Sequence, residues 1–130
     1  MGVRDKLILG VKPYISAIRE IEKISTLDNP VDMVQCLSLS FARLKSEVVD
    51  FHKGKFELES MDDVLPLTIY CVAFANLPYA ASFHNIMQDF LRQVNGFDLE
   101  RKLLCNFDCA IKFVCTDSTF NTPWFCYILM

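Results

Sequence analysis

The chain has 130 residues, a formal net charge of −3, and 52% hydrophobic residues. This length suits one domain, so we expect residues 1–130 to form a single helical unit, and the apolar content argues against intrinsic disorder. The few glycines and prolines argue against a loop-rich β-sandwich or barrel. No basic stripe is visible in the sequence, so nucleic acid is not expected as a partner.

Five helical patterns follow one another along the chain, and no alternating strand pattern is convincing. The first runs from about Pro13 to Ile24, with an isoleucine at every third position from residue 15. The second begins after Asn29, which can cap a helix, and Pro30 suits the first helical position. Its apolar positions recur at intervals of three and four from Val34 to Val48, and charged residues as far as Asp50 take the other face, which indicates an amphipathic helix.

The third helix is predicted from about Asp62 to Ala75, after a loop over residues 51–60 that contains Gly54. This helix has almost no polar face. A helix that is apolar on all sides is surrounded by other helices, so we expect it to be the buried centre of the domain.

The fourth helix is predicted from about Ser82 to Val94, and the Asn-Gly pair that follows is a helix stop. Asp98 can cap the fifth helix, whose buried stripe runs from Leu99 to Val114. After Cys115 the pattern fails. The predicted fold class is therefore all-α, a layered bundle of about five to six helices around a buried central helix at about 62–75.

Six cysteines are present, and none belongs to a CxxC pair. Four of them fall in apolar helical patterns, where a reduced cysteine behaves as a small hydrophobic residue: Cys36, Cys71, Cys105 and Cys109. His52 and His84 are isolated from the cysteines, so we expect no metal and no cofactor. No secretory signal or apolar run of transmembrane length is visible, so we expect a cytoplasmic protein whose membrane association is indirect.

Two adjacent carboxylates, Asp62 and Asp63, stand at the start of the third helix, and Pro66 follows. The simplest explanation is a helix cap, worth about 0.5–2 kcal/mol. One cap needs one carboxylate, however, and Pro66 removes the helical donor for the Asp62 carbonyl. We expect Asp63 to stabilise the first turn, Pro66 to shape it, and Asp62 to be presented to a partner. No catalytic triad or phosphate-binding glycine loop is present, so no covalent chemistry is expected.

The order of these motifs resembles the vacuolar-protein-sorting-nine domain, the guanine-nucleotide-exchange module of Rabex-, Rin- and Alsin-type proteins. The resemblance covers about residues 11–114, whereas 116–130 do not match. Its most specific part is D-D-x-x-P, an apolar helix and A-N-x-P, which spans residues 62–78. The motif N-P-x-D-x-x-Q-C at residues 29–36 supports it independently.

The resemblance implies a helical domain that promotes GDP release from early-endosomal Rab GTPases of the Rab-five subfamily. It implies that Asp62 enters the nucleotide site of the GTPase, disturbs Mg²⁺ and β-phosphate binding, and engages the phosphate-loop lysine. It also implies GTPase contacts by Asp63, Pro66 and Asn76. Recruitment from the cytoplasm to early endosomes would accompany this activity.

Two departures from the family pattern lie in the fifth helix. Lys102 and Cys105 occupy the positions where the family usually has a tyrosine and a threonine, and they become the expected GTPase-binding residues there. Leu77 replaces the first proline of the family's N-P-P motif. These differences leave two alternatives open, namely a non-catalytic Rab-binding or protein-interaction module, and a fragment of a larger endosomal trafficking regulator.

Overall fold

The computed structural model describes residues 14–51 and 61–116, and these segments are almost entirely helical. The α-helices are α2 (Ile15–Glu22), α3 (Pro30–Phe51), α4 (Met61–Phe74), α5 (Ala80–Arg92) and α6 (Asp98–Thr116). A short 3-10 helix, η1 (Lys23–Thr26), continues α2. No strand occurs in the described segments, and the predicted all-α fold class is confirmed.

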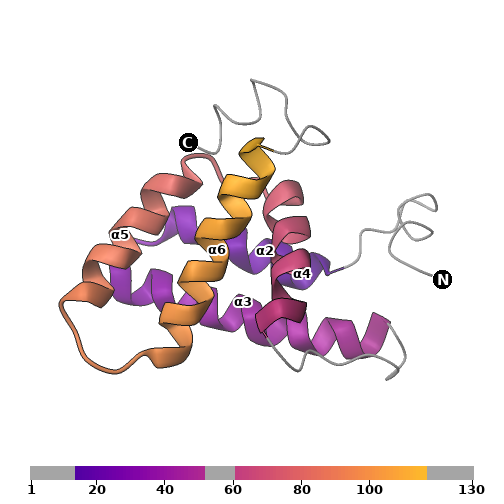
Figure 1. The fold of residues 1–130 in the computed structure, drawn as a ribbon, viewed down its shortest axis with the longest axis horizontal. Coiled ribbons are helices and arrows are strands. Elements are labelled where there is room, and N and C mark those ends of the chain that lie inside the picture. Colours follow the sequence, from indigo (N-terminus) through magenta and orange to yellow (C-terminus); the bar gives the residue numbers. More distant parts are fainter. Residues whose placement is uncertain (1–13, 52–60, 117–130) are drawn as a thin grey trace.

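The helices form two layers, with α4, α6 and α5 in one and α2 and α3 in the other (Figure 1). The closest helix pairs are α4 with α6 and α2 with α3, and α6 also contacts both α5 and α3. The middle position of its layer therefore belongs to α6, flanked by α4 and α5. Within residues 14–51 and 61–116, no helix combines the length and apolarity needed to cross a bilayer.

The central position of α6 modifies the expectation that the helix at about 62–75 is the buried centre. That helix is α4, and Val64, Cys71 and Val72 on it are buried. Pro66 and Phe74 are exposed, however. An apolar sequence on all sides does not by itself show that all sides are covered by the same chain.

The core is built where both layers meet. Its completely buried members come from α3, α5, α6 and η1: Ile24, Val48, Ala80, Met87, Phe107, Ala110 and Val114. The isoleucine spacing of the first helix is explained by this packing, because Ile18 and Ile21 are also buried there. A side chain of this size stabilises the fold by about 1.5–3 kcal/mol when it is fully removed from water.

The start of α3 confirms the predicted cap. The Asn29 side-chain oxygen accepts a hydrogen bond from the N–H of Asp32 at 2.9 Å. The Asn29 amide in turn donates to the Asp32 carboxylate at 2.8 Å. The two side chains thus satisfy each other as in a capping box, and Pro30 is the first helical residue.

Three other helices begin after an aromatic residue in the left-handed region. Tyr14, Tyr79 and Phe97 have φ angles of 60°, 61° and 58°, and they precede α2, α5 and α6. Each carbonyl accepts an early helical hydrogen bond. The left-handed conformation costs a non-glycine residue about 1–2 kcal/mol. Because Phe97 holds this position, Asp98 is the first residue within α6 and not its predicted cap.

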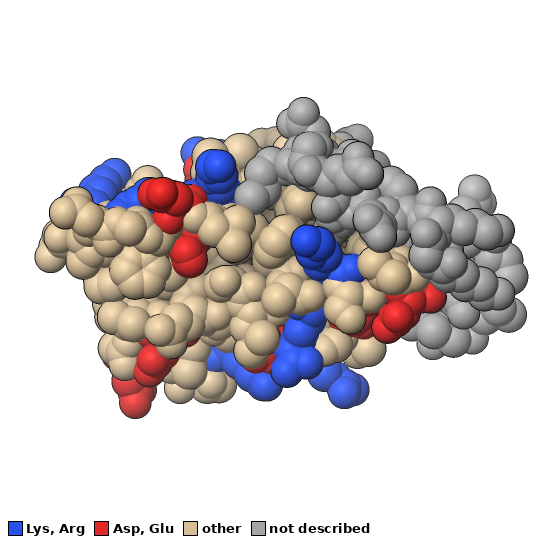
Figure 2. Space-filling view, turned by 90° about the horizontal axis from the view of Figure 1, so that it is seen from below, with Lys and Arg blue, Asp and Glu red and all other residues tan. Residues whose placement is uncertain are grey.

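Charged side chains of both signs are interspersed on the face seen in Figure 2. They stand on a largely uncharged surface and gather in small groups. A nucleic-acid-binding face is dominated by one sign of charge. On the face in Figure 2, therefore, neither sign of charge dominates.

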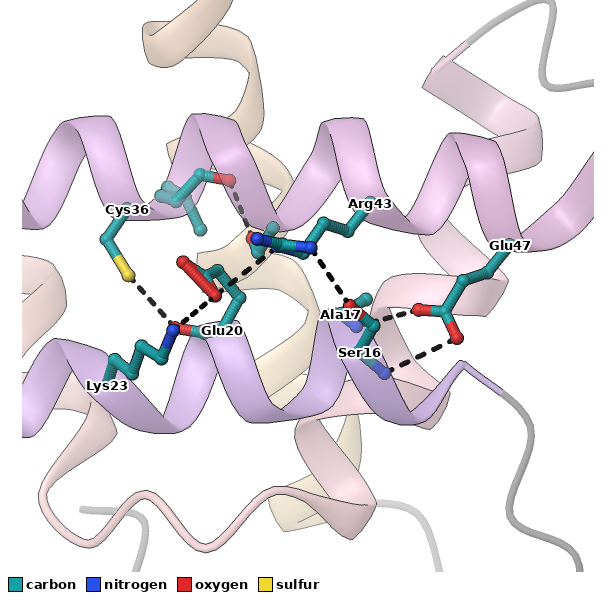
Figure 3. A network of polar contacts seen from close by, with 9 residues as sticks. Ser16, Ala17, Glu20, Lys23, Cys36, Arg43 and Glu47 are labelled. Atoms are coloured by element: carbon teal, nitrogen blue, oxygen red, sulfur yellow. Dashed lines mark hydrogen bonds and ion pairs between the residues drawn. The ribbon is translucent and has the colours of Figure 1, made fainter.

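Helices α2 and α3 run antiparallel and are joined by polar contacts (Figure 3). Glu20 is buried and pairs with Arg43 at 3.4 Å and with Lys23 at 3.0 Å. The thiol of Cys36 donates to the backbone carbonyl of Glu20 at 2.9 Å. A buried carboxylate costs little only when such partners are in place, so this cluster sets the register between the two helices.

Candidate functional site

The acidic pair lies in the first turn of α4. The helix begins at Met61, so Asp62 and Asp63 are its second and third residues. The partial positive charge at a helix start favours carboxylates at both positions. The expected division of roles between the two aspartates concerns their side chains, which lie outside the described residues.

Pro66 is one turn further along α4 and is exposed. Positions four residues apart lie on the same face of a helix, so the backbone places 62 and 66 in one strip. Proline has no N–H, and the Asp62 carbonyl therefore has no helical donor four residues later. Buried Val64 lies between them in sequence and anchors the opposite side of this turn in the core.

Helix α6 presents a second exposed strip. Its members recur every three or four residues: Leu99, Lys102, Cys105, Cys109 and Phe113. Leu103, Phe107 and Val114 face the core on the other side. The strip is therefore a mixture of apolar, thiol and cationic groups on the outer surface of the central helix of its layer.

Two expectations for α6 are wrong. Cys105 and Cys109 are exposed and do not act as buried hydrophobic residues, and Leu99 is 44% exposed although it was placed in the buried stripe. The stripe that packs against the core begins at Leu103, one turn later. Partial desolvation, together with the neighbouring Cys105 and Asp108, raises the pKa of the Cys109 thiol.

The structure brings most of the expected site residues to one end of the domain. Helices α4 and α6 pack against each other and run in the same direction, so both helices begin on the same side of the domain (Figure 1). Asp62, Asp63 and Pro66 start α4, and Lys102 and Cys105 lie in the first turns of α6. These two strips form the candidate site.

Asn76 lies apart from the other expected residues. It follows the last turn of α4, and a helix of that length separates its ends by roughly 20 Å. The N–H of Asn76 donates to the Glu22 carboxylate at 2.6 Å, which ties the end of α4 to α2. The structure thus gives the backbone of Asn76 a role in joining the layers.

Further along α4, beyond Pro66, lies an aromatic cluster that sequence reasoning missed. The ring of Tyr70 contacts Phe74 at 4.7 Å and meets Tyr14 edge-on at 5.7 Å between centroids. The Tyr70 hydroxyl is buried and has no hydrogen-bond partner among the described residues 14–51 and 61–116. Burial, followed by the neighbouring Cys71 and Tyr14, raises the pKa of Tyr70 to about 12. The spacing of four between the two α4 rings was the available sequence signal.

Fold and site together define an all-α domain whose candidate site is a surface at one end of two parallel helices. The model of the Vacuolar sorting protein 9 (VPS9) domain family matches residues 14–119, most of the chain, and the protein belongs to this family. Membership implies guanine-nucleotide exchange on small GTPases of the Rab type in general. Comparisons with curated proteins and with solved structures gave no significant match.

Proposed function

We propose that this domain accelerates GDP release from early-endosomal GTPases of the Rab-five subfamily, with Asp62 as the residue that enters the nucleotide site. The observation that carries the proposal is the start of α4. There Asp62 lies in the first turn, on the same face as exposed Pro66, and the following turns are anchored in the core. A carboxylate on such a rigid element can be held in one place relative to a docked partner.

The proposed mechanism is electrostatic. Mg²⁺ and the phosphate-loop lysine of a GTPase hold the nucleotide largely by charge. In a partly desolvated cleft, the Asp62 carboxylate competes with the phosphates for the lysine and repels them. The domain then binds the nucleotide-free GTPase more tightly than the loaded one, and this differential affinity drives release. No covalent bond is formed, and the chain needs no nucleophile.

The remaining expected residues have supporting roles in this proposal. Pro66 would accept the switch regions of the GTPase, and Asp63 would hold the first turn. Lys102 and Cys105 would contact the GTPase from the strip on α6 at the same end. Asn76 would contact it from beyond the far end of α4. The domain would work in the cytoplasm and at early endosomes, where these GTPases reside.

The test is release of a fluorescent GDP analogue from a panel of Rab proteins that includes the Rab-five subfamily. We expect the Rab-five members to respond and Asp62→Ala to slow release by at least about tenfold while unfolding stability stays unchanged. Asp50→Ala removes an exposed carboxylate on α3 and is the matched control. A panel without any response, or full activity in Asp62→Ala, contradicts the proposal. Unfolding of Asp62→Ala would show that this aspartate instead stabilises the first turn of α4.

A second candidate function is Rab binding without exchange. The observation that favours it is the exposed position of Lys102 and Cys105, where the family pattern has tyrosine and threonine. A binding assay without accelerated release would identify this function. The double substitution Lys102→Tyr, Cys105→Thr should then gain exchange activity, because it introduces the family residues at both positions.

A further inference from the structure

A groove of about 250 Å³ lies between α5 and α6, outside the proposed GTPase site except for Cys105 at its rim. Buried Leu91 and Leu104 form its apolar part. The polar side chains come from both helices: His84, Gln88, Arg92, Arg101, Cys105 and Asp108. The three α5 members recur every four residues and therefore share one face of that helix.

Arg101 is the central charged group of this groove. It is half-buried, and its guanidinium donates to the backbone carbonyls of Leu91 and Val94 at the end of α5. In the described segments, no carboxylate lies within ion-pair distance of it. A guanidinium has five N–H donors, so donors remain for a further acceptor. The carbonyl dipoles of Leu91 and Val94 partly offset its charge.

The other donors converge on the same space. Arg92 pairs with Asp89 at 3.4 Å, and both side chains are about two-thirds exposed, so this pair is weak and easily exchanged. His84 is only 6% exposed although it lines the groove. Gln88 adds an amide between these two residues. The opposing charge is Asp108, which is itself paired with Lys112 at 2.9 Å.

We propose that this groove binds inorganic phosphate. Arg92 and Arg101 supply guanidinium donors, and Gln88 and His84 supply further N–H groups. Donors that approach from two helices suit a phosphate, which accepts hydrogen bonds from several directions, better than a planar carboxylate, which pairs with one guanidinium fork. The inference is independent of the proposed action on GTPases.

The experiment is an NMR titration of the chain with inorganic phosphate at constant ionic strength and pH. We expect saturable shifts of the Arg92 and Arg101 side-chain N–H signals and of the His84 ring. Arg92→Gln should weaken binding by about fivefold to tenfold, because one charge-assisted contact is lost. Lys45→Gln removes an exposed positive charge from α3 and should leave the affinity unchanged.

A second pair of variants tests the sign of the charge effect. Asp108→Asn should tighten phosphate binding by several fold, whereas Asp50→Asn, at an exposed position on α3, should not. Shifts that grow linearly without saturation would overturn the proposal. Equal effects of the groove variants and their controls would also overturn it, because they would indicate a general response to net charge.

Discussion

The carboxylate of Glu47 on α3 accepts hydrogen bonds from the backbone N–H groups of Ser16 at 3.3 Å and Ala17 at 2.8 Å (Figure 3). These donors belong to the first turn of α2, where Tyr14 provides no side-chain cap. A residue 30 positions away in sequence therefore caps this helix. The contact fixes the start of α2 against the C-terminal half of α3.

Glu47→Ala should lower the free energy of unfolding by about 1–2 kcal/mol, because it leaves the first-turn N–H groups of α2 without their acceptor. Urea unfolding measures the change. Asp50→Ala, on the same helix but exposed, should have almost no effect. Equal losses in the two variants would show that the Glu47 contact contributes nothing. Glu47→Gln keeps one acceptor oxygen and should recover part of the loss.

Tyr70→Phe should leave stability unchanged or raise it by up to about 1 kcal/mol. The hydroxyl that it removes is buried and finds no hydrogen-bond partner in the described part of the chain, and the ring contacts to Tyr14 and Phe74 remain. Tyr70→Leu should destabilise the domain, since it removes both aromatic pairs. Thermal unfolding of the two variants makes the comparison. A clear loss of stability in Tyr70→Phe would reveal a hydrogen bond of the hydroxyl in solution.

The buried thiol of Cys71 should make the domain sensitive to alkaline pH. Burial is the main cause that raises its pKa from 9.0 to about 12, and the charge of Glu47 adds to it. Above about pH 9 the unfolded chain loses this proton while the native state keeps it, so stability falls as pH rises toward 12. The slope of this contribution approaches about 1.4 kcal/mol per pH unit.

Cys71→Ala tests this contribution. Urea unfolding between pH 7 and pH 10.5 should show a shallower alkaline decline for the variant than for the parent. Below about pH 8 the difference in unfolding free energy between the variant and the parent should be constant, because the Cys71 thiol is then protonated in both the native and the unfolded state. Parallel pH profiles throughout the range would contradict the assignment.

The structural role of the Asn76 backbone and its proposed GTPase contact can be separated by substitution. Asn76→Ala keeps the N–H that donates to Glu22, so stability should change by less than about 0.5 kcal/mol. Glu22→Ala removes the acceptor and should cost about 1 kcal/mol. A loss of GTPase affinity in Asn76→Ala, with unchanged unfolding, would assign the amide side chain to the interface. Unchanged affinity would leave only the structural role.

Tyr79 should be a site where substitution stabilises the protein. Its φ angle is 61° and its side chain is 65% exposed. The backbone strain at Tyr79 is therefore offset by little burial of its side chain. Tyr79→Gly should raise the free energy of unfolding by about 0.5–1 kcal/mol. The equivalent change at Tyr14, whose ring is 2% exposed, should destabilise the domain. Thermal unfolding distinguishes the two outcomes.

The order of the helices and the cap at Asn29 could be predicted because they depend on local signals. Apolar spacing identifies a helix, and Asn-Pro identifies its start. The start of α5 was placed two residues late, since a left-handed tyrosine gives no recognisable capping signal. The central position of α6 was missed because it depends on which faces of separate helices meet, and a single sequence does not contain that information directly.

The residues of the candidate site also fall into two groups, those that local sequence signals could place and those that they could not. The place of Asp62 in the first turn of α4 followed from carboxylate and proline positions along the chain. Lys102 was linked to it only through the family resemblance, and the shared end of α4 and α6 became visible in three dimensions. The long-range contact of Arg101 with the end of α5 left no local pattern to be recognised.

Arg101 has a mechanical consequence for the hairpin of α5 and α6. Its bonds to Leu91 and Val94 close the hairpin at the connecting segment, and the edge-on packing of Phe90 against Phe97 reinforces that end. We therefore expect movements of α5 relative to α6 to be smallest at the connecting segment and largest at the start of α5. Native-state hydrogen exchange should follow this gradient, with faster opening near Ala80 than near Leu91.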